Sequence, residues 1–366
     1  MRSSFSPPGL RVVPLGRRQL FAEPRRLLAA AMAVGLAISM ILLVEGLWEG
    51  MRQRVTVYED AVGADLYVVA PGTLMLFGNN STIPISTLRT VRATPGVTWA
   101  AAIRAQFIIV DLHAKKVPIS LVGYTPGERG GPWAMARGRE PRLDDEVVVD
   151  DVLARRHGLQ VGQELDVLGH QFRLVGTSRG TASFMTGFAF VTHRATDALM
   201  RQPGTTSAVL VGATDPAAVR SRLTSEGLTV FSHAELRAYG LKFATQTFGL
   251  VIRVMVAVAF AVGALVIALT AYAAIVERRR EYGIVKAIGA NSRRLSLLVL
   301  GQTLTLAALG SVTGVALFVV GRFAITTLRP QFSLPLTEGT LAKAALAALV
   351  MAVVAALIPA RRLARL

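Results

Sequence analysis

The sequence predicts an α-helical membrane protein with four transmembrane helices and a large α+β extracytoplasmic domain between the first and the second of them. Three observations predict this fold: four apolar segments of spanning length, a polar stretch after the first segment, and clusters of basic residues at one end of the segments. An α-helix needs about 20 residues to cross roughly 30 Å of hydrocarbon. The hydrophobic content of 52% agrees with this class, although a large soluble core would have a similar composition.

The apolar segments set the expected domain boundaries. We expect transmembrane helices at 27–47, 251–276, 295–320 and 341–358, an outer domain at 48–250, a cytoplasmic loop at 277–294, a short outer loop at 321–340, and cytoplasmic ends at 1–26 and 359–366. The first apolar run is longer than the core of a typical signal peptide and is followed by no A-x-A cleavage pattern, which favours a retained anchor.

The orientation follows from the basic residues next to these segments. Six arginines precede the first segment, six Lys or Arg lie in the 277–294 loop, and three arginines follow the last segment. Basic residues near the ends of spans remain on the cytoplasmic side. We therefore expect a multi-pass protein of the cytoplasmic (inner) membrane with both termini in the cytoplasm.

The net charge of +17 does not by itself indicate nucleic-acid binding. Residues 48–250 hold 21 Lys and Arg against 18 Asp and Glu, so most of the excess flanks the apolar segments. Such basic residues face lipid headgroups and fix topology. We expect membrane lipid, and no nucleic acid, as the partner of these charges.

The stretch at 48–250 has the alternating patterns of a folded mixed domain. We expect strands at 65–69, 107–112, 117–123, 146–149, 164–168, 172–176, 187–191, 208–211 and 228–231, and helices at 85–93, 150–157, 193–201 and 215–226. Ser232 and Glu235 have the spacing of a capping box, so a helix can start there and continue into the second span. The first helix can continue outward in the same way, giving two stalk helices. Alternatively, both helices break at the membrane surface.

Motifs for chemistry within this chain are absent from the sequence. There is no G-x-x-x-x-G-K-[ST] phosphate loop, no G-x-S-x-G and no H-E-x-x-H. Because there is no cysteine, thiolate metal sites and disulfides are excluded. The five histidines show no ligand spacing: His113, His157, His170, His193 and His233. We expect a non-catalytic chain with no metal and no cofactor of its own.

The basic loop at 277–294 is the candidate functional element. Its middle can form a short amphipathic helix with Ile284, Val285 and Ile288 on one face, bounded by Gly283 and Gly289. Such a helix between two spans can dock into a groove of a soluble partner and pass movement to the spans. The alternative is that its charges only anchor the loop to lipid headgroups.

A resemblance favours the docking role. The segment from Arg278 to Ala290 resembles the R-x-R-E-I-G-I-x-K-A-x-G-A pattern of the FtsX/MacB-like ABC transporter permeases, a mechanotransmission family that includes the lipoprotein-releasing and DevC-like subgroups, with Tyr282 in place of an isoleucine. The tail from Ile358 to Leu366 is similar to the P-A-R-R-A-A-R-L tail of that family. The Gly138-Arg139 turn, the E-V-V-V-D run ending at Asp150 and a G-L-x-V-G motif also resemble its outer domain.

The resemblance implies a permease dimer that works with two copies of a separate cytoplasmic ATPase, which would bind the ATP and Mg. A periplasmic adaptor or membrane-fusion protein is a further partner. By this analogy, the ATPase-coupling residues are Arg280, Glu281, Gly283, Ile284, Lys286, Ala287 and Gly289. An amphipathic elbow helix in residues 1–26 would contain Arg17, Arg18, Arg25 and Arg26, for which simple anchoring to the inner leaflet is an equal alternative.

Two functions of different classes remain open from the sequence. The leading hypothesis is a permease that extrudes or extracts a hydrophobic or amphipathic substrate, such as a lipid, lipoprotein, glycolipid or drug. The alternative is an FtsX-like transmitter that activates a periplasmic cell-wall hydrolase. The large outer domain favours transport, because a transmitter needs only a small docking surface. A membrane-anchored enzyme is a weaker third reading, since no catalytic constellation is present.

Overall fold

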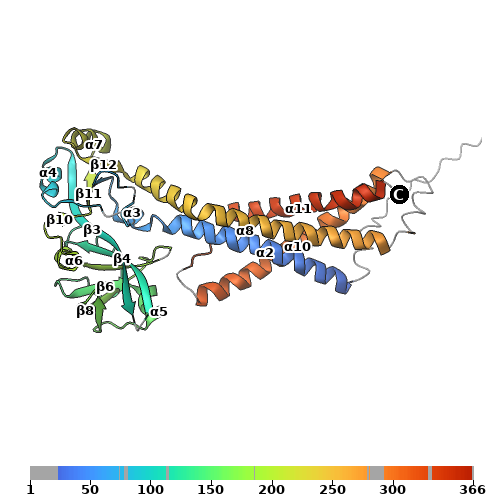
Figure 1. The fold of residues 1–366 in the computed structure, drawn as a ribbon, viewed down its shortest axis with the longest axis horizontal. Helices are drawn as coiled ribbons and strands as arrows, with labels where there is room; N and C mark the ends of the chain where they lie inside the picture. Colours follow the sequence, from blue (N-terminus) through green and yellow to red (C-terminus); the bar gives the residue numbers. More distant parts are fainter. Residues whose placement is uncertain are drawn as a thin grey trace, which may run out of the picture. The chain divides into compact units, whose positions relative to one another are not determined.

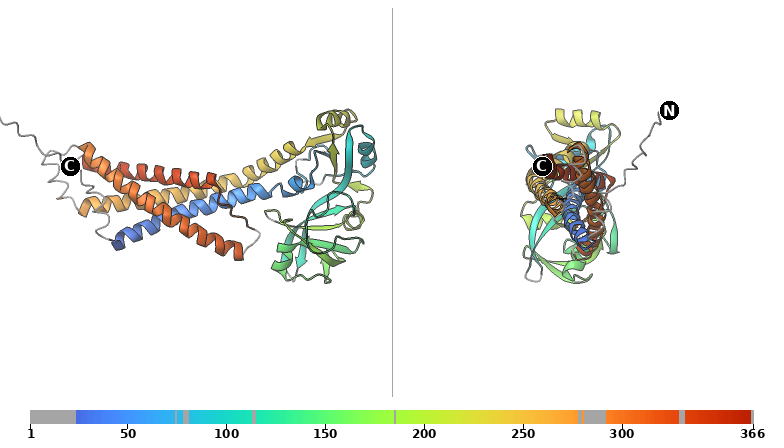
Figure 2. Two further views of the ribbon diagram at one scale, coloured as in Figure 1. Left: turned by 180° about the vertical axis from the view of Figure 1, so that it is seen from behind. Right: turned by 90° about the vertical axis from the view of Figure 1, so that its right-hand side faces the viewer.

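The computed structural model describes residues 24–73, 75–77, 81–112, 115–184, 186–277, 280, 292–328 and 332–364. The chain forms two compact units. The membrane unit comprises residues 1–48, 251–327 and 334–366, and the outer unit comprises residues 49–250 and 328–333. Figures 1 and 2 show the helices of the first unit and the sheet of the second.

The membrane unit is built from four helices that are long and apolar enough to cross a membrane. They are α2 (Pro24–Arg54), α8 (His233–Glu277), α10 (Ser292–Leu328) and α11 (Glu338–Ala364). Their inward faces form one apolar cluster that includes Val34, Leu42, Ile267, Phe318 and Met351. The outward faces carry exposed Leu, Val and Phe side chains, as lipid-facing helices do.

Glycines allow these helices to approach closely within the chain. A Cβ on Gly35 of α2 would lie 2.3 Å from Thr313 Oγ1 of α10, and one on Gly310 would lie 2.4 Å from Val34. Thr313 Oγ1 also donates to the carbonyl of Ala31 across this contact at 3.0 Å. Small residues are the usual means of close helix packing in membranes. Gly35, Gly263, Gly310 and Gly314 thus all pack against this chain's own helices.

The outer unit contains a ten-stranded sheet in the order β12-β1-β11-β3-β4-β9-β6-β8-β5, with β7 beside β8. Its strands are β1 (Leu66–Val69), β3 (Val97–Leu112), β4 (Lys115–Tyr124), β5 (Met135–Gly138), β6 (Glu146–Asp150), β7 (Glu164–Val167), β8 (His170–Ser178), β9 (Gly187–Thr192), β11 (Ala208–Ala213) and β12 (Thr229–Ser232). A two-stranded ribbon joins β2 (Ile83–Pro84) to β10 (Thr205–Thr206). The helices are α3 (Val57–Val62), α4 (Thr87–Ala93), α5 (Asp151–His157), α6 (His193–Met200) and α7 (Pro216–Ser225).

The long strand β3 divides the outer unit into two halves. Its first part pairs with β11 as far as Ile103, and its second part pairs with β4 from Arg104 onward. On the β11 side, α4 and α7 cover a core of Val91, Val209, Val219 and other aliphatic residues. On the β4 side, the strands enclose a separate core that includes Leu121, Val147 and Leu174.

The motifs singled out in the sequence have a structural role at the edge of the second half. Arg139 donates from both terminal nitrogens to the carboxylate of Glu146 at the start of β6, with Nη1 to Oε2 at 2.6 Å. The Glu146 carboxylate also accepts from the backbone N–H groups of Arg142 and Leu143. The hydrogen bond from Arg139 is the main reason why the pKa of Glu146 falls to about 2. Gly138 allows this turn, because a Cβ there would lie 2.2 Å from the carbonyl oxygen of Val175.

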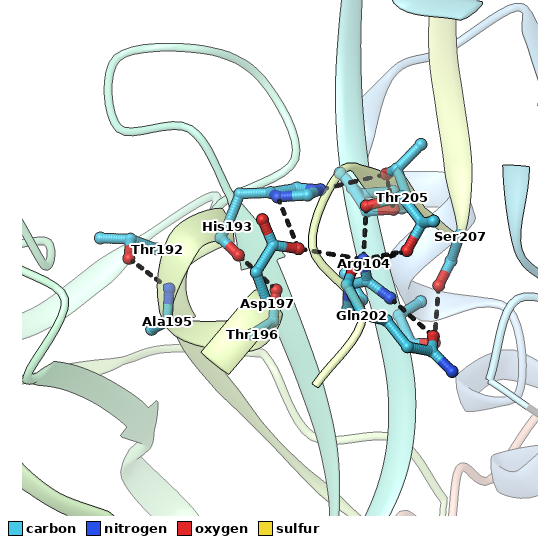
Figure 3. A network of polar contacts seen from close by, with 12 residues as sticks. Arg104, Thr192, His193, Ala195, Thr196, Asp197, Gln202, Thr205 and Ser207 are labelled. Atoms are coloured by element: carbon cyan, nitrogen blue, oxygen red, sulfur yellow. Dashed lines mark hydrogen bonds and ion pairs between the residues drawn. The ribbon is translucent and has the colours of Figure 1, made fainter. Parts of the chain in front are cut away.

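A buried arginine holds the two halves together where β3 changes partner. The Arg104 side chain is 3% exposed and donates to Asp197 of α6 at 3.0 Å, to Gln202 of the following loop and to Thr205 of β10. Strand β10 is also joined to β3, because Thr206 Oγ1 donates to the carbonyl of Ile103 at 2.7 Å. Figure 3 shows Asp197, Gln202 and Thr205 around Arg104.

Helix α3 fixes a buried carboxylate in the outer unit. Its Tyr58 is fully buried among Phe77, Trp133 and Phe188, and the Tyr58 hydroxyl donates to the carbonyl of Gly130 at 2.8 Å. The neighbouring Glu59 side chain is 8% exposed. Burial raises the pKa of Glu59 to about 7, since water no longer stabilises the charged form.

Replacing Arg104 by methionine tests the arginine contact. Arg104→Met leaves Asp197 and the loop carbonyls without their donor, so we expect a loss of about 3 kcal/mol of stability and a melting temperature lower by about 8 °C. The measurement is thermal unfolding of the full chain in detergent. Arg194→Met on exposed α6 surface is the matched control, and an equal shift in both variants would contradict this role.

The buried Glu59 predicts a pH dependence of a definite sign. Its pKa is higher in the folded chain than the ordinary 4.5, so the folded state binds the proton more tightly. The free energy of unfolding therefore decreases as the pH rises from about 4.5 to about 7, by roughly 3 kcal/mol from this group. In urea titrations at pH 5 and pH 8, Glu59→Gln should lose this part of the pH dependence. The exposed Glu226→Gln is the matched control. If the free energy of unfolding of Glu59→Gln depended on pH as strongly as that of the wild type, the prediction would be contradicted.

Candidate functional site

The predicted ATPase-coupling segment lies mostly outside the described residues. Of its seven residues, the structure describes Arg280, whose side chain is exposed. Glu281, Gly283, Ile284, Lys286, Ala287 and Gly289 fall in the part of the chain that is not described. The segment is bounded by α8, which ends at Glu277, and by α10, which begins at Ser292. Its coupling role therefore stays a prediction.

An ion pair joins two helices next to this segment. Arg26, in the first turn of α2, donates to the carboxylate of Glu277 at the end of α8. Arg25 lies beside it in α2, whereas Arg17 and Arg18 of the predicted elbow lie outside the described residues. Both side chains of the pair are more than a third exposed, and such pairs contribute only about 0.5 kcal/mol. The contact links the two helix ends without locking them.

Helix α8 is continuous between the last strand of the outer unit and the loop that carries the coupling segment. The capping box is formed as its spacing indicates: Glu235 N–H donates to Ser232 Oγ at 3.2 Å, and Ser232 N–H donates to Glu235 Oε2 at 2.9 Å. The hydrogen bond from the Ser232 backbone is the main reason why the pKa of Glu235 is lowered. From this cap the helix runs 45 residues to Glu277. At 1.5 Å per residue its length is about 68 Å.

Titratable side chains in the described part of the chain form no group of three or more that could hold a metal ion. His193 contacts Asp197 and Thr206 in the network of Figure 3, and burial lowers its pKa. His233 contacts Asp60 of α3 at 2.9 Å. Each of these two histidines thus has a partner of its own within the fold.

The outer unit holds a cavity of about 430 Å³, which we call the Phe184 pocket. It is within the size range of small-ligand sites, roughly 300–1,000 Å³. It lies between β4, α5, the segment before β9 and the connection between α10 and α11. Its walls are mostly apolar and are lined by Val117, Pro118, Val152, Leu153, Ala182, Phe184, Gly187 and Phe332, with Asp150, Arg156 and Thr186 as the polar residues.

Aromatic contacts connect the wall of this pocket to helix α8 and to the non-helical connection between α10 and α11. The Phe184 ring lies 6.1 Å from the ring of Phe332, in the connection between α10 and α11. It lies 6.4 Å from the ring of Phe248 on α8. Both contacts have the edge-on geometry that aromatic pairs prefer. The wall therefore touches chain segments that adjoin three of the candidate spans.

The sequence reading missed this pocket. Phe184 and Phe332 are distant in the chain, and each sits in a short segment of mainly polar and small residues, T-A-S-F-M-T and P-Q-F-S. A single aromatic residue in such a segment was the only available signal. The aliphatic wall residues belong to ordinary strand and helix patterns, which do not distinguish a cavity wall from a filled core.

A second hollow, of about 410 Å³, lies beside Trp99 and Glu128 in the same unit. Its charged side chains are engaged with one another. Arg92 donates to Glu128 at 2.7 Å, and the Arg129 guanidinium lies 4.6 Å from the centre of the Trp99 ring. The charged side chains of this hollow are therefore engaged in contacts within the fold. For this reason the Phe184 pocket is the stronger candidate for a ligand site.

Comparison with known proteins identifies both units. Residues 27–226 match the family model of the MacB-like periplasmic core domain, and residues 253–366 match that of the FtsX-like permease C-terminal domain. An uncharacterized ABC transporter permease of Mycobacterium tuberculosis is 26% identical over 306 residues, which cover 82% of this chain and 83% of the relative. One of Mycobacterium bovis is 26% identical over 314 residues, covering 84% of this chain and 85% of the relative.

Two solved structures were also found. The extracellular domain of YknZ, a noncanonic ABC-type transporter from Gram-positive bacteria, covers 46% of this chain and 99% of its own, with 12% identity and a TM-score of 0.36. The periplasmic region of MacB from Actinobacillus actinomycetemcomitans covers 49% and 92%, with 12% identity and a TM-score of 0.37. The family matches and the four apolar helices confirm the predicted fold class of a membrane-embedded protein. This chain belongs to the ABC transporter permeases of the FtsX/MacB type.

Proposed function

We propose that this chain is the non-catalytic membrane subunit through which a separate cytoplasmic ATPase moves the outer domain, so that a hydrophobic or amphipathic substrate is extruded or extracted at the outer leaflet. ATP and Mg would be held by two copies of the ATPase. The observation that carries the proposal is the continuity of α8, which ties β12 of the outer unit to the end of the coupling segment.

A continuous helix is suited to this role because it transmits displacement along its axis. Its backbone hydrogen bonds run unbroken from residue to residue, so a push at one end is not absorbed by a hinge. Gly240, Gly249 and Gly263 lie within α8 without ending it. Movement of the coupling residues Arg280 to Gly289 would thus be delivered to β12, the strand that precedes α8.

The remaining parts of the proposal follow from membership of the family. We propose an inner-membrane location with both termini in the cytoplasm, based on the basic residues that flank the spans. We also propose a dimer of this chain, contacts of Arg17, Arg18, Arg25 and Arg26 with the inner leaflet, and an adaptor protein on the outer side. The match to the MacB-like periplasmic core over 27–226 supports transport rather than activation of a cell-wall hydrolase.

The coupling role can be tested by co-purification of the ATPase. Glu281→Lys combined with Gly283→Trp reverses a charge and adds an indole on the predicted docking helix, so we expect at least a tenfold loss of the ATPase activity that co-purifies with the tagged, membrane-extracted chain. The matched control is Glu164→Lys combined with Ser221→Trp, which makes the same changes on the exposed surface of the outer unit.

Two results would contradict the proposal. One is that no ATPase co-purifies with the wild-type chain while its thermal unfolding shows that it is folded. The other is that the coupling variant retains as much ATPase activity as the control variant. Either result would direct attention to a free-standing membrane receptor.

A further inference from the structure

The Phe184 pocket offers almost no free polar group in its interior. Asp150 is 1% exposed, but its Oδ1 accepts from the N–H groups of Val152 and Leu153 at 3.0 and 3.1 Å, and its Oδ2 accepts from Thr181 at 2.9 Å. Thr186 is bonded to Ser120 at 2.8 Å. A ligand inside the pocket therefore meets aliphatic and aromatic surface, and binding it removes apolar area from water.

One cation stands at the rim of this apolar space. Arg156 lines the pocket from α5, and its side chain is exposed. Its neighbour Arg155 is engaged with Asp151, whereas Arg156 forms no ion pair with any side chain in the described parts of the chain. A guanidinium can bind a carboxylate or phosphate with two parallel hydrogen bonds. Among the described residues that line it, the pocket thus combines an apolar interior with an anion-binding side chain, Arg156, at its edge.

This combination matches an amphipathic molecule with one alkyl chain and an anionic head. A purely polar solute would leave the apolar walls unused and would find no partner inside, because the interior polar groups are already bonded. A neutral hydrocarbon would leave Arg156 unused. The pocket is also bounded by Phe332, in a connection between two membrane helices, and Phe184 contacts Phe248 in α8.

We propose that the Phe184 pocket binds an alkyl chain of an anionic lipid, with the head group held by Arg156. The lipid site rests on the proposed function in one respect. The bound lipid would be a transported substrate only if this chain is a transport permease. Because α8 and the α10–α11 connection both reach Phe184, displacement of either segment changes the pocket wall and so changes the hold on the alkyl chain. Phe248 of α8, the helix that delivers the movement, contacts the Phe184 ring of this wall.

The proposal can be tested by photolabelling. The full chain, reconstituted in phosphatidylcholine nanodiscs without an ATPase, is mixed with a sixteen-carbon fatty acid that bears a diazirine near its methyl end, and the labelled peptides are identified by mass spectrometry. We expect saturable labelling of the segments around Val152, Phe184 and Phe332. Val152→Trp fills the pocket and should reduce labelling there at least fivefold, whereas Phe107→Trp, on exposed surface of β3, should not.

The head-group contact has its own measurement. Arg156→Glu should weaken competition by unlabelled palmitate at least fivefold and leave competition by methyl palmitate unchanged, because only the acid carries the negative charge. Arg155→Glu, on the same helix but outside the pocket, is the matched control. Labelling confined to the lipid-facing sides of α8, α10 and α11, or labelling in the pocket that Val152→Trp leaves unchanged, would overturn the proposal.

These outcomes are independent of the test of the proposed function, because the photolabelling needs no ATPase. If no ATPase co-purified with the folded wild-type chain while the pocket was still labelled, the coupling role would be refuted and the lipid site kept. ATPase co-purification with the wild-type chain and no labelling of the pocket would refute the lipid site and keep the coupling role. The melting temperature of each variant shows whether it has folded. If Val152→Trp fails to fold, Phe332→Trp serves as a second variant that fills the pocket.

Discussion

The outer domain depends on how one strand, β3, is shared between two halves, which have their own aliphatic cores and also share a buried cluster that includes Tyr67, Tyr124 and Phe190. A strand that changes partner leaves backbone groups at the point of change that neither neighbour can satisfy, and an unpaired buried group costs about 1–3 kcal/mol. Arg104 stands at this point, and Thr206 and Ser207 bond the carbonyl of Ile103 from the facing loop. The guanidinium suits the position because it is planar, always charged and able to serve several acceptors at once. The two halves can therefore move as one body.

The sequence predicted most of the strands and helices in both halves, but not β5 or the short ribbon of β2 and β10. Strands such as β4, β6 and β9 are rich in Val, Ile and Phe, and their patterns identify them directly. The first part of β3 was missed, since Ala100, Ala101 and Ala102 have little intrinsic preference for a strand. Its pairing with β11 overrides that preference. Glycine at positive φ ends a helix where the sequence predicts it, as Gly158 does after α5.

The two candidate sites differ in how far sequence could identify them. The coupling segment is continuous in the chain, so its charges, glycines and family pattern can be read as one stretch. The Phe184 pocket is assembled from four separate parts of the chain, and no local pattern joins Phe184 to Phe332. Whether an aliphatic side chain lines a cavity or fills a core depends on the volume left by its neighbours, which only the packed structure defines.

The contacts of α3 indicate how a displacement of α8 would reach the outer domain. On one side, α3 is held by Tyr58, whose burial among Phe77, Trp133 and Phe188 is worth about 2–3 kcal/mol before its hydrogen bond is counted. On the other side, Asp60 meets His233 and Arg237 of α8 through partly exposed ion pairs, which contribute about 1 kcal/mol or less each. Leu236 of α8 is also buried, in the same apolar cluster as Tyr58 and Val62 of α3. Movement of α8 would therefore reach the outer domain through this cluster, through β12 and through the aromatic contact of Phe248 with Phe184.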